Sequence, residues 1–261
     1  TFDDVILNYN TYFVPANAYL VIVGDVNFKE VKKEVERLFG SWKKATAPQL
    51  TYTAPKDVQY SQINFIDTPN AVQSEIALVN LSNLKMTDKE YFSVLLANQI
   101  LGGGGEGRLF LNLREKHGWT YGAYSSIGSG KYISKFRSSA SVRNTVTDSA
   151  VVEFFNELKR IKTDLVSEED LRNAKAKYVG NFVMQIEKPS TIAGYALNKE
   201  TQGLPEDFYE NYIKNINAVT AEDIKNAANK YFLSDNTRVV IVGKAGDVLP
   251  GLEAMSKREK L

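Results

Sequence analysis

Arg114 and Tyr121 are the two side chains whose types and spacing best suit recognition of a peptide group. Arg114 lies near the end of a predicted helix, and Tyr121 follows seven positions later, past Gly118, where a strand begins. Because Gly118 can turn the chain, both side chains can reach one end of a sheet. A guanidinium and a phenol there would donate hydrogen bonds to a peptide carbonyl or to an oxyanion formed from it. Spacing alone favours the ordinary interpretation, an arginine facing solvent near a helix end and a tyrosine in a sheet.

The second feature is a run of glycines just before Arg114. Three of them, Gly102, Gly104 and Gly107, fit the pattern G-x-G-x-x-G. A dinucleotide site needs a strand before the glycines, whereas a helix is predicted here, and no lysine follows Gly107 to bind a phosphate. The pattern therefore favours a turn between two helices, and nucleotide binding is the weaker alternative. Four consecutive glycines are entropically costly to order, so we expect a flexible or ligand-facing loop rather than a rigid connector. This loop comprises Gly102, Gly103, Gly104, Gly105 and Gly107.

The sequence offers almost nothing to bind a metal. His117 is the only histidine, and cysteine is absent, so this chain cannot form an ordinary zinc site. His117 is predicted in the last turn of a helix and is interpreted as a surface residue. The acidic run at residues 168–170 lies in the first turn of a predicted helix and indicates capping rather than a pair of catalytic carboxylates. We therefore expect no metal, no cofactor and no catalytic residue in this chain by itself.

Composition excludes further classes of protein. The net charge of +1 over 261 residues lacks the basic excess of a nucleic-acid-binding protein. No apolar run approaches the roughly 18 residues of a membrane span, so we expect none. The absence of cysteine fits any compartment, and the localisation stays open, with the bacterial periplasm or cell envelope as one candidate.

A long internal repeat organises the chain. Residues 1–24 match residues 220–243 at a constant offset of 219 without a gap, and ten positions are identical. A repeat at this distance has the size of a domain. We therefore predict that residues 1–50 are the C-terminal piece of one truncated domain with a linker, and that residues 51–261 form a complete second domain.

Local patterns predict the elements of both parts. Capping boxes that begin at Thr1, Thr87, Ser167 and Thr220 predict four helix starts. Apolar runs at residues 19–23 and 239–242 predict central strands, and a helix is expected at 28–39 with Gly40 just past its end. Residues 42–55 are interpreted as the linker. Further strands are predicted at 59–66, 74–81, 121–127 and 132–142. Further helices are predicted at 87–101, 107–117, 148–162, 168–186 and 205–216, followed by a frayed polar tail at 257–260. This mixture predicts an α+β fold, a mostly antiparallel sheet with helices packed on it.

Two segments carry a resemblance to a known family. Residues 101–124 closely resemble the Leu-Gly-Gly-Gly…Arg-Leu-Phe…Leu-Arg-Glu-Lys-x-Gly-x-x-Tyr stretch of the insulinase (pitrilysin) family of zinc metallopeptidases. Residues 12–25 are similar to the segment that ends the first domain in that family. The resemblance implies paired domains like those of the mitochondrial processing peptidase, in halves that close on an unfolded peptide. One half binds zinc on an inverted His-x-x-Glu-His helix. The other contributes an arginine and a tyrosine, which Arg114 and Tyr121 match.

The resemblance sets the functional expectations. This chain has no His-x-x-Glu-His motif, so zinc would be bound elsewhere in the assembled enzyme. The implied partners are a peptide substrate and a zinc-bearing half, on the same polypeptide or on a separate subunit. The implied role is to form part of the chamber wall and to bind the substrate backbone through Arg114 and Tyr121. The alternative is a non-catalytic structural subunit, similar to the core proteins of a respiratory complex.

The strand predicted at residues 19–23 adds an expectation about assembly. Without the rest of its domain, an apolar strand has unpaired edges that can recruit another chain. We therefore expect packing on the second domain or a homodimer, with a disordered piece on a monomer as the alternative.

Overall fold

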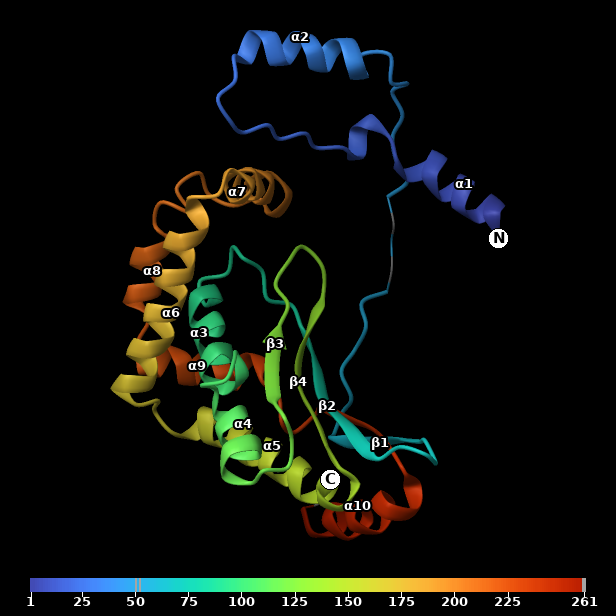
Figure 1. Ribbon diagram of the computed structural model, residues 1–261, viewed down its shortest axis with the longest axis vertical. Helices are drawn as coiled ribbons and strands as arrows, with labels where there is room; N and C mark the ends of the chain where they lie inside the picture. The colour runs from blue at the N-terminus through green and yellow to red at the C-terminus, as the bar shows by residue number, and fades with distance from the viewer. Residues whose placement is uncertain (50, 52, 260–261) are drawn as a thin grey trace. The chain divides into compact units, whose positions relative to one another are not determined.

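The computed structural model describes residues 1–49, 51 and 53–259 (Figure 1). The chain divides into two compact units: residues 1–54 with 182–204, and residues 55–181 with 205–261. The boundary predicted at residue 50 lies outside the described residues, and the division into domains 1–50 and 51–261 stays a prediction.

A five-stranded sheet forms the centre of the second unit, with the strand order β1-β5-β2-β4-β3. The strands are β1 (Gln62–Asp67), β2 (Gln73–Ser82), β3 (Ala123–Ile127), β4 (Ser134–Arg143) and β5 (Arg238–Gly243). β1 and β5 are parallel, and the other three pairings are antiparallel. This confirms the predicted α+β class and the mostly antiparallel sheet. The apolar run at 239–242 is a central strand, as predicted.

One face of the sheet carries the core. Helices α3 (Tyr91–Gly102), α5 (Thr147–Thr163) and α9 (Ala221–Tyr231) pack together against this face. Side chains that alternate along β2 and β5 are buried beneath them, including Leu78 and Ile241, both fully inaccessible to solvent. Phe136 of β4 stacks on Phe232 at a centroid distance of 4.4 Å, which ties the sheet to the end of α9.

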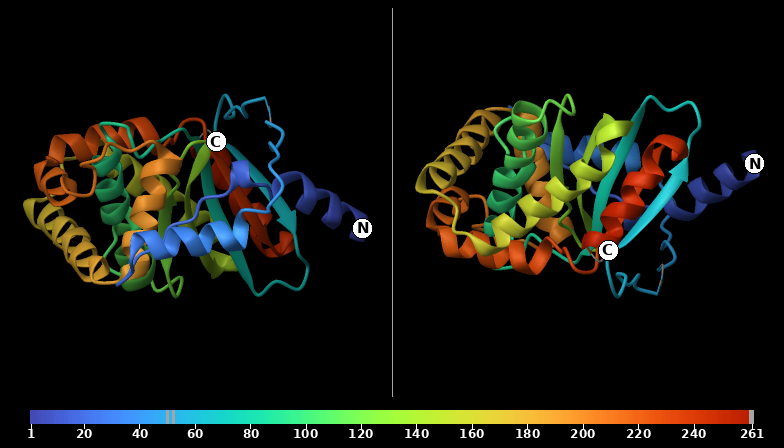
Figure 2. Two further views of the ribbon diagram at one scale, coloured as in Figure 1. Left: turned by 90° about the horizontal axis from the view of Figure 1, so that it is seen from above. Right: turned by 90° about the horizontal axis from the view of Figure 1, so that it is seen from below.

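Further helices surround this core. α4 (Arg108–Phe110) continues into η2 (Leu111–Lys116), η3 (Asn144–Val146) precedes α5, and α10 (Ala245–Glu259) packs on α5. α6 (Glu168–Ile186) begins as predicted, with the Ser167 hydroxyl accepting a hydrogen bond from the Asp170 amide at 3.0 Å. α8 (Tyr212–Ala218) lies against α3, which separates it from the sheet (Figures 1 and 2). None of the helices that the structure describes is long and apolar enough to cross a membrane.

The first unit contains α1 (Phe2–Tyr12), η1 (Pro15–Asn17), α2 (Phe28–Phe39) and α7 (Pro189–Gln202). Thr1 and Asp4 form the predicted capping box of α1, as Thr220 and Asp223 do at α9. α2 has the predicted bounds, although Gly40 keeps a helical φ of −63° instead of the left-handed conformation of a typical helix stop.

The strand predicted at residues 19–23 is wrong. This segment forms no strand in the described structure, and Tyr19 and Leu20 are 62% and 58% exposed. A strand needs a neighbour to satisfy its backbone groups, and no described strand pairs with these residues. The matching run in β5 is held between β1 and β2.

Two helix boundaries are also corrected. The capping box expected at Thr87 does not form, because the Asp88 carboxylate accepts from the Lys85 amide at 2.9 Å and α3 begins only at Tyr91. The helix expected at residues 205–216 is reduced to α8, because residues 205–211 form turns, in which the Phe208 amide bonds to the Pro205 carbonyl at 3.1 Å.

Two helices were not predicted. α7 begins with Pro189 and ends at Gly203, which has a left-handed φ of +64°. α10 contains Pro250, which disguised its helical pattern, although Val248, Leu252 and Met255 are buried at helical spacing. The expected polar tail is therefore wrong at Lys257, which lies in the last turn of α10, while residue 260 lies outside the described part of the chain.

Candidate functional site

The glycine-rich stretch folds as a tight turn between α3 and α4. Gly102 is buried in the last turn of α3, where an added Cβ would lie 2.5 Å from the Ser125 amide nitrogen of β3. A Cβ on Gly107 would lie 2.8 Å from the Cα of Gly102. Gly104 has a φ of +154°, which favours glycine. Close packing of backbones thus explains Gly102 and Gly107, and a helix rather than a strand precedes them. A ligand role for the other glycines stays a prediction.

Arg114 lies on a π-helix, which the sequence did not predict. The single helix expected at 107–117 consists of α4 followed by the π-helical η2, in which the His117 amide bonds to the Asn112 carbonyl at 3.1 Å. Gly118, with a φ of +62°, then ends the helix as expected. π-helical turns are rare, and they occur frequently at functional sites because they re-aim side chains.

The two sequence-predicted donors are both accessible. The Arg114 side chain is 46% exposed, its guanidinium lies 4.7 Å from the centroid of the Phe110 ring, and its Nε lies 3.6 Å from Glu115. Tyr121 is 89% exposed, in the bend before β3. The Phe110 ring also contacts Tyr124 of β3, at 6.0 Å between centroids. Phe110 therefore lies between the Arg114 guanidinium and β3, while the convergence of Arg114 and Tyr121 on one group stays a prediction.

His117 is not a free surface residue. Its ring stacks on Trp119 at a centroid distance of 4.1 Å, and it is half-buried. Among the described residues no group of three or more His, Asp or Glu side chains is arranged to hold a metal ion.

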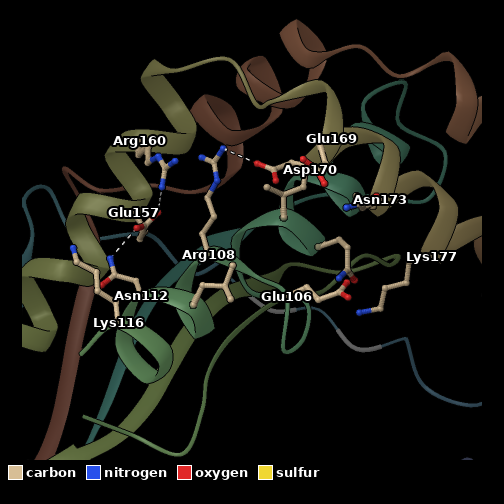
Figure 3. Close-up of a pocket in the computed structure, with 14 residues that line it drawn as sticks. Glu106, Arg108, Asn112, Lys116, Glu157, Arg160, Glu169, Asp170, Asn173 and Lys177 are labelled. Atoms are coloured by element: carbon tan, nitrogen blue, oxygen red, sulfur yellow. Dashed lines mark hydrogen bonds and ion pairs between the residues drawn. The ribbon is translucent and has the colours of Figure 1, made fainter. Parts of the chain in front are cut away.

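A cavity of about 510 Å³ lies beside the glycine turn (Figure 3). Glu106 and Arg108 line it from the turn and α4, and Asn112 and Lys116 line it from η2. α5 and α6 complete the wall with charged and amide side chains, namely Glu157, Arg160, Glu169, Asp170, Asn173 and Lys177. Because cationic and anionic side chains are equally represented in this wall, the cavity has no strong preference for an anion or a cation.

Buried polar contacts tie η2 to α5 at this cavity. The Asn112 amide donates to Glu153 at 2.7 Å and to Glu157 at 2.8 Å, as Figure 3 shows for the Glu157 contact. Arg160 approaches Glu157 at 3.7 Å, and Arg108, with a side chain only 9% exposed, approaches Asp170 at 3.5 Å. These contacts fix the segment that carries Arg114.

Sequence reasoning missed Arg108 and Asn112. Their signal was present: two polar side chains four positions apart that flank the apolar residues 109–111 in a predicted helix, and therefore lie on one face. At the other end of α3, burial raises the pKa of Tyr91 to about 12.

A family model described as the peptidase M16 inactive domain matches residues 1–178. The chain belongs to this family. This confirms the resemblance to the metallopeptidases that the motif at 101–124 indicated.

Curated relatives agree with this assignment. A probable inactive metalloprotease of Bacillus subtilis is 26% identical over 211 residues, covering 81% of this chain and 48% of its own length. An uncharacterized zinc protease of Rickettsia bellii is 29% identical over 241 residues, covering 86% of this chain and 53% of its own. The chain thus spans about half the length of these relatives.

Solved structures share the fold. A protease from Helicobacter pylori has a TM-score of 0.83 at 20% identity, over 93% of this chain and 59% of its own. A chain of respiratory complex III from Candida albicans has a TM-score of 0.72 at 12% identity, over 98% of this chain and 62% of its own. At these identities the likeness concerns the fold alone.

Proposed function

We propose that this chain is the portion of an M16 metallopeptidase that does not bind zinc, and that it forms chamber wall and binds the backbone of a peptide substrate. The observation that supports this most directly is the pair of accessible donors that follow the glycine turn. A tyrosine that is 89% exposed contributes little to packing, and Arg114 lies on a π-helix, a rare structure that occurs frequently at functional sites. Both features suit binding better than they suit stability.

The chemistry follows from the donor types. Zinc held by another part of the enzyme would supply an activated water for attack on the peptide carbonyl. The Arg114 guanidinium and the Tyr121 phenol would donate hydrogen bonds to a substrate carbonyl or to the oxyanion as its charge develops. The chain would therefore position the substrate without containing the catalytic base. We expect the purified chain to hold no stoichiometric zinc by elemental analysis and not to cleave peptides.

Peptide binding by the purified chain tests the proposal. The probe is a fluorescent, unstructured peptide of neutral composition, and the readout is anisotropy. Removing one neutral hydrogen bond costs about 0.5–1.5 kcal/mol, so Tyr121→Phe should weaken binding roughly two- to twelvefold. Tyr60→Phe, at another exposed tyrosine, and Arg172→Met on α6 are matched controls for Tyr121→Phe and Arg114→Met.

The competing function is a structural subunit, which the likeness to a complex III chain favours. A scaffold has no use for a peptide site. If the chain does not bind the peptide, or if Arg114→Met and Tyr121→Phe bind it as the two controls do, the scaffold interpretation replaces the proposal.

A further inference from the structure

Within the described residues of the second unit, no helix buries the second face of the sheet. In β4 the side chains that face α5 are buried, among them Phe136 and Ser138, whereas the intervening Lys135 and Arg137 are exposed. β2 and β3 alternate in the same way. We call the side chains of β1–β5 that point away from α3 and α5 the open face. It lies entirely within the second unit.

The charges of the open face are mostly positive. β4 contributes Lys135, Arg137 and Arg143, and β5 contributes Arg238. Lys135, Arg137 and Arg238 form no ion pair in the part of the chain that the structure describes. Arg143 donates to the Gly118 carbonyl at 3.0 Å.

Among the described strands, Glu75 is the acidic residue that the register places on this face, and it accepts from the Ser141 hydroxyl. Asp57, which precedes β1, accepts from the Leu81 amide at 2.9 Å. Glu75 reduces the positive charge of the open face without neutralising its arginines. The face therefore offers cationic side chains that lack partners.

Strand register places two of these cations in one row. Val79 of β2 pairs with Arg137 on one side and with Arg238 on the other. Two strand spacings of about 4.8 Å put the backbones of the two arginines roughly 10 Å apart. The adjacent row has small or β-branched side chains on the three central strands, Ser139, Ala77 and Val240, and it ends at Tyr124 on β3 and Asn64 on β1. The arginines thus stand beside an uncharged strip whose three central side chains leave room for an extended chain.

We propose that the open face binds an acidic segment of the peptide substrate, with its carboxylates at Arg137 and Arg238; this rests on the proposed function. The row of Arg137 meets β3 at Ser126, five residues beyond Tyr121. At about 3.3 Å per residue this separation is at most roughly 17 Å, because Tyr121 lies in the bend before β3. For a peptide that follows the strands, an acidic side chain is favoured about five residues from the residue held by Arg114 and Tyr121.

A peptide suits this surface better than a nucleic acid does. A phosphate backbone carries a charge at every nucleotide and needs a continuous cationic track. Here the cations are few, Glu75 lies two rows from Arg137, and the net charge of the chain is only +1. A peptide with one or two carboxylates matches the two arginines and the uncharged strip beside them.

The test uses three fluorescent peptides of about twelve residues, long enough to span both sites. They share one sequence except at two adjacent positions, which lie five and six residues from the central residue. Both positions are Asp in the first peptide, Ser in the second and Lys in the third. Two exposed ion pairs predict that the Asp peptide binds the chain about two- to thirtyfold more tightly than the Ser peptide. The advantage should shrink near 1 M salt, where the Debye length falls to about 3 Å.

Variants assign the effect to the row. Combining Arg137→Gln with Arg238→Gln should abolish the difference in affinity between the Asp and Ser peptides. Combining Arg137→Lys with Arg238→Lys should retain this difference, and Arg172→Gln on α6 should not change it. Circular dichroism verifies that each variant is folded. Equal affinity for the Asp and Ser peptides, or an advantage that survives the Gln substitutions, overturns the inference.

Two further results separate the possibilities. Loss of Ser-peptide binding in Tyr121→Phe reports on the proposed function, whereas the difference between the Asp and Ser peptides reports on the open face alone. If single-stranded DNA of the same charge binds more tightly than the Asp peptide and competes with it, the surface recognises nucleic acid and the inference is wrong.

Discussion

Replacing Asn112 should disturb the site more than its neutral side chain suggests. Asn112 is 8% exposed, and its amide donates to Glu153 at 2.7 Å and to Glu157 at 2.8 Å. The Glu157 residue is buried, so its carboxylate depends on this donor and on Arg160 at 3.7 Å. The substitution Asn112→Leu keeps the branching of the side chain at Cγ and removes both hydrogen bonds.

The magnitude follows from the two contacts. A hydrogen bond to a charged group contributes about 1.5–3 kcal/mol, and a buried charge left without a partner adds a desolvation cost. Glu153 is partly exposed and can regain water, so we expect a loss of about 2–4 kcal/mol in the free energy of unfolding. With a urea slope of about 2 kcal/mol/M, the midpoint falls by roughly 1–2 M.

Urea denaturation followed by circular dichroism measures this loss. The control is Asn173→Leu, at an exposed asparagine on α6 that lines the same cavity, where the change should stay within about 0.5 kcal/mol. Combining Asn112→Leu with Glu157→Met should cost less than the sum of the single changes, because each removes the other's partner. Strict additivity, or a loss no larger than in the control, would refute this account of the contact.

Three further predictions concern other parts of the chain. A hydrogen bond from Lys230 lowers the pKa of Glu90, and the Glu90 carboxylate raises the pKa of Lys230. The contribution of Glu90 to the free energy of unfolding is therefore fully present above the pKa of Glu90 in the unfolded chain. It is lost as the pH falls through the lowered pKa of Glu90 in the folded chain. Lys230→Met should thus cost at most about 1 kcal/mol near pH 7 and nothing near pH 2, measured by thermal melts. Gly107→Ala should destabilise by about 1–3 kcal/mol, because its Cβ meets Gly102 at 2.8 Å, whereas Gly180→Ala, an open helical site, should stabilise by about 0.5–1 kcal/mol. Because Tyr19, Leu20 and Ile22 are exposed apolar side chains, light scattering should find a dimer that becomes a monomer when the chain begins at Thr53; an unchanged state would exclude residues 1–52 as the cause.

The sequence predicted most of the second unit because many of its helices and strands carry local sequence signals. The apolar run at residues 239–242 marked β5, and the capping box at Thr220 marked α9. The failures occurred where two local signals competed. Next to Thr87, the Asp88 carboxylate accepts a hydrogen bond from the Lys85 amide, and the expected capping box does not form. In α10, Pro250 argued against a helix although the buried apolar residues follow helical spacing.

The candidate site was only partly predictable for a different reason. Residue type and spacing singled out Arg114 and Tyr121, and those properties are local. The contact between Asn112 and Glu157 joins positions 45 apart in sequence, and the π-helix beneath Arg114 depends on what packs around it. Such features arise from tertiary packing, which a single sequence does not display.

The internal repeat shows how the same apolar pattern behaves in two different structural surroundings. Leu20 and Ile22 occupy the repeat positions of Val239 and Ile241, yet they are 58% and 45% exposed, while their counterparts are fully buried. The difference lies in the neighbours, since β5 pairs with β1 in parallel and with β2 in antiparallel orientation. An apolar segment of this kind therefore forms a strand only where neighbouring strands are available to pair with its two edges. Where matching strands are supplied, we expect residues 19–23 to pair in the same way, one neighbour parallel and the other antiparallel, and to become buried.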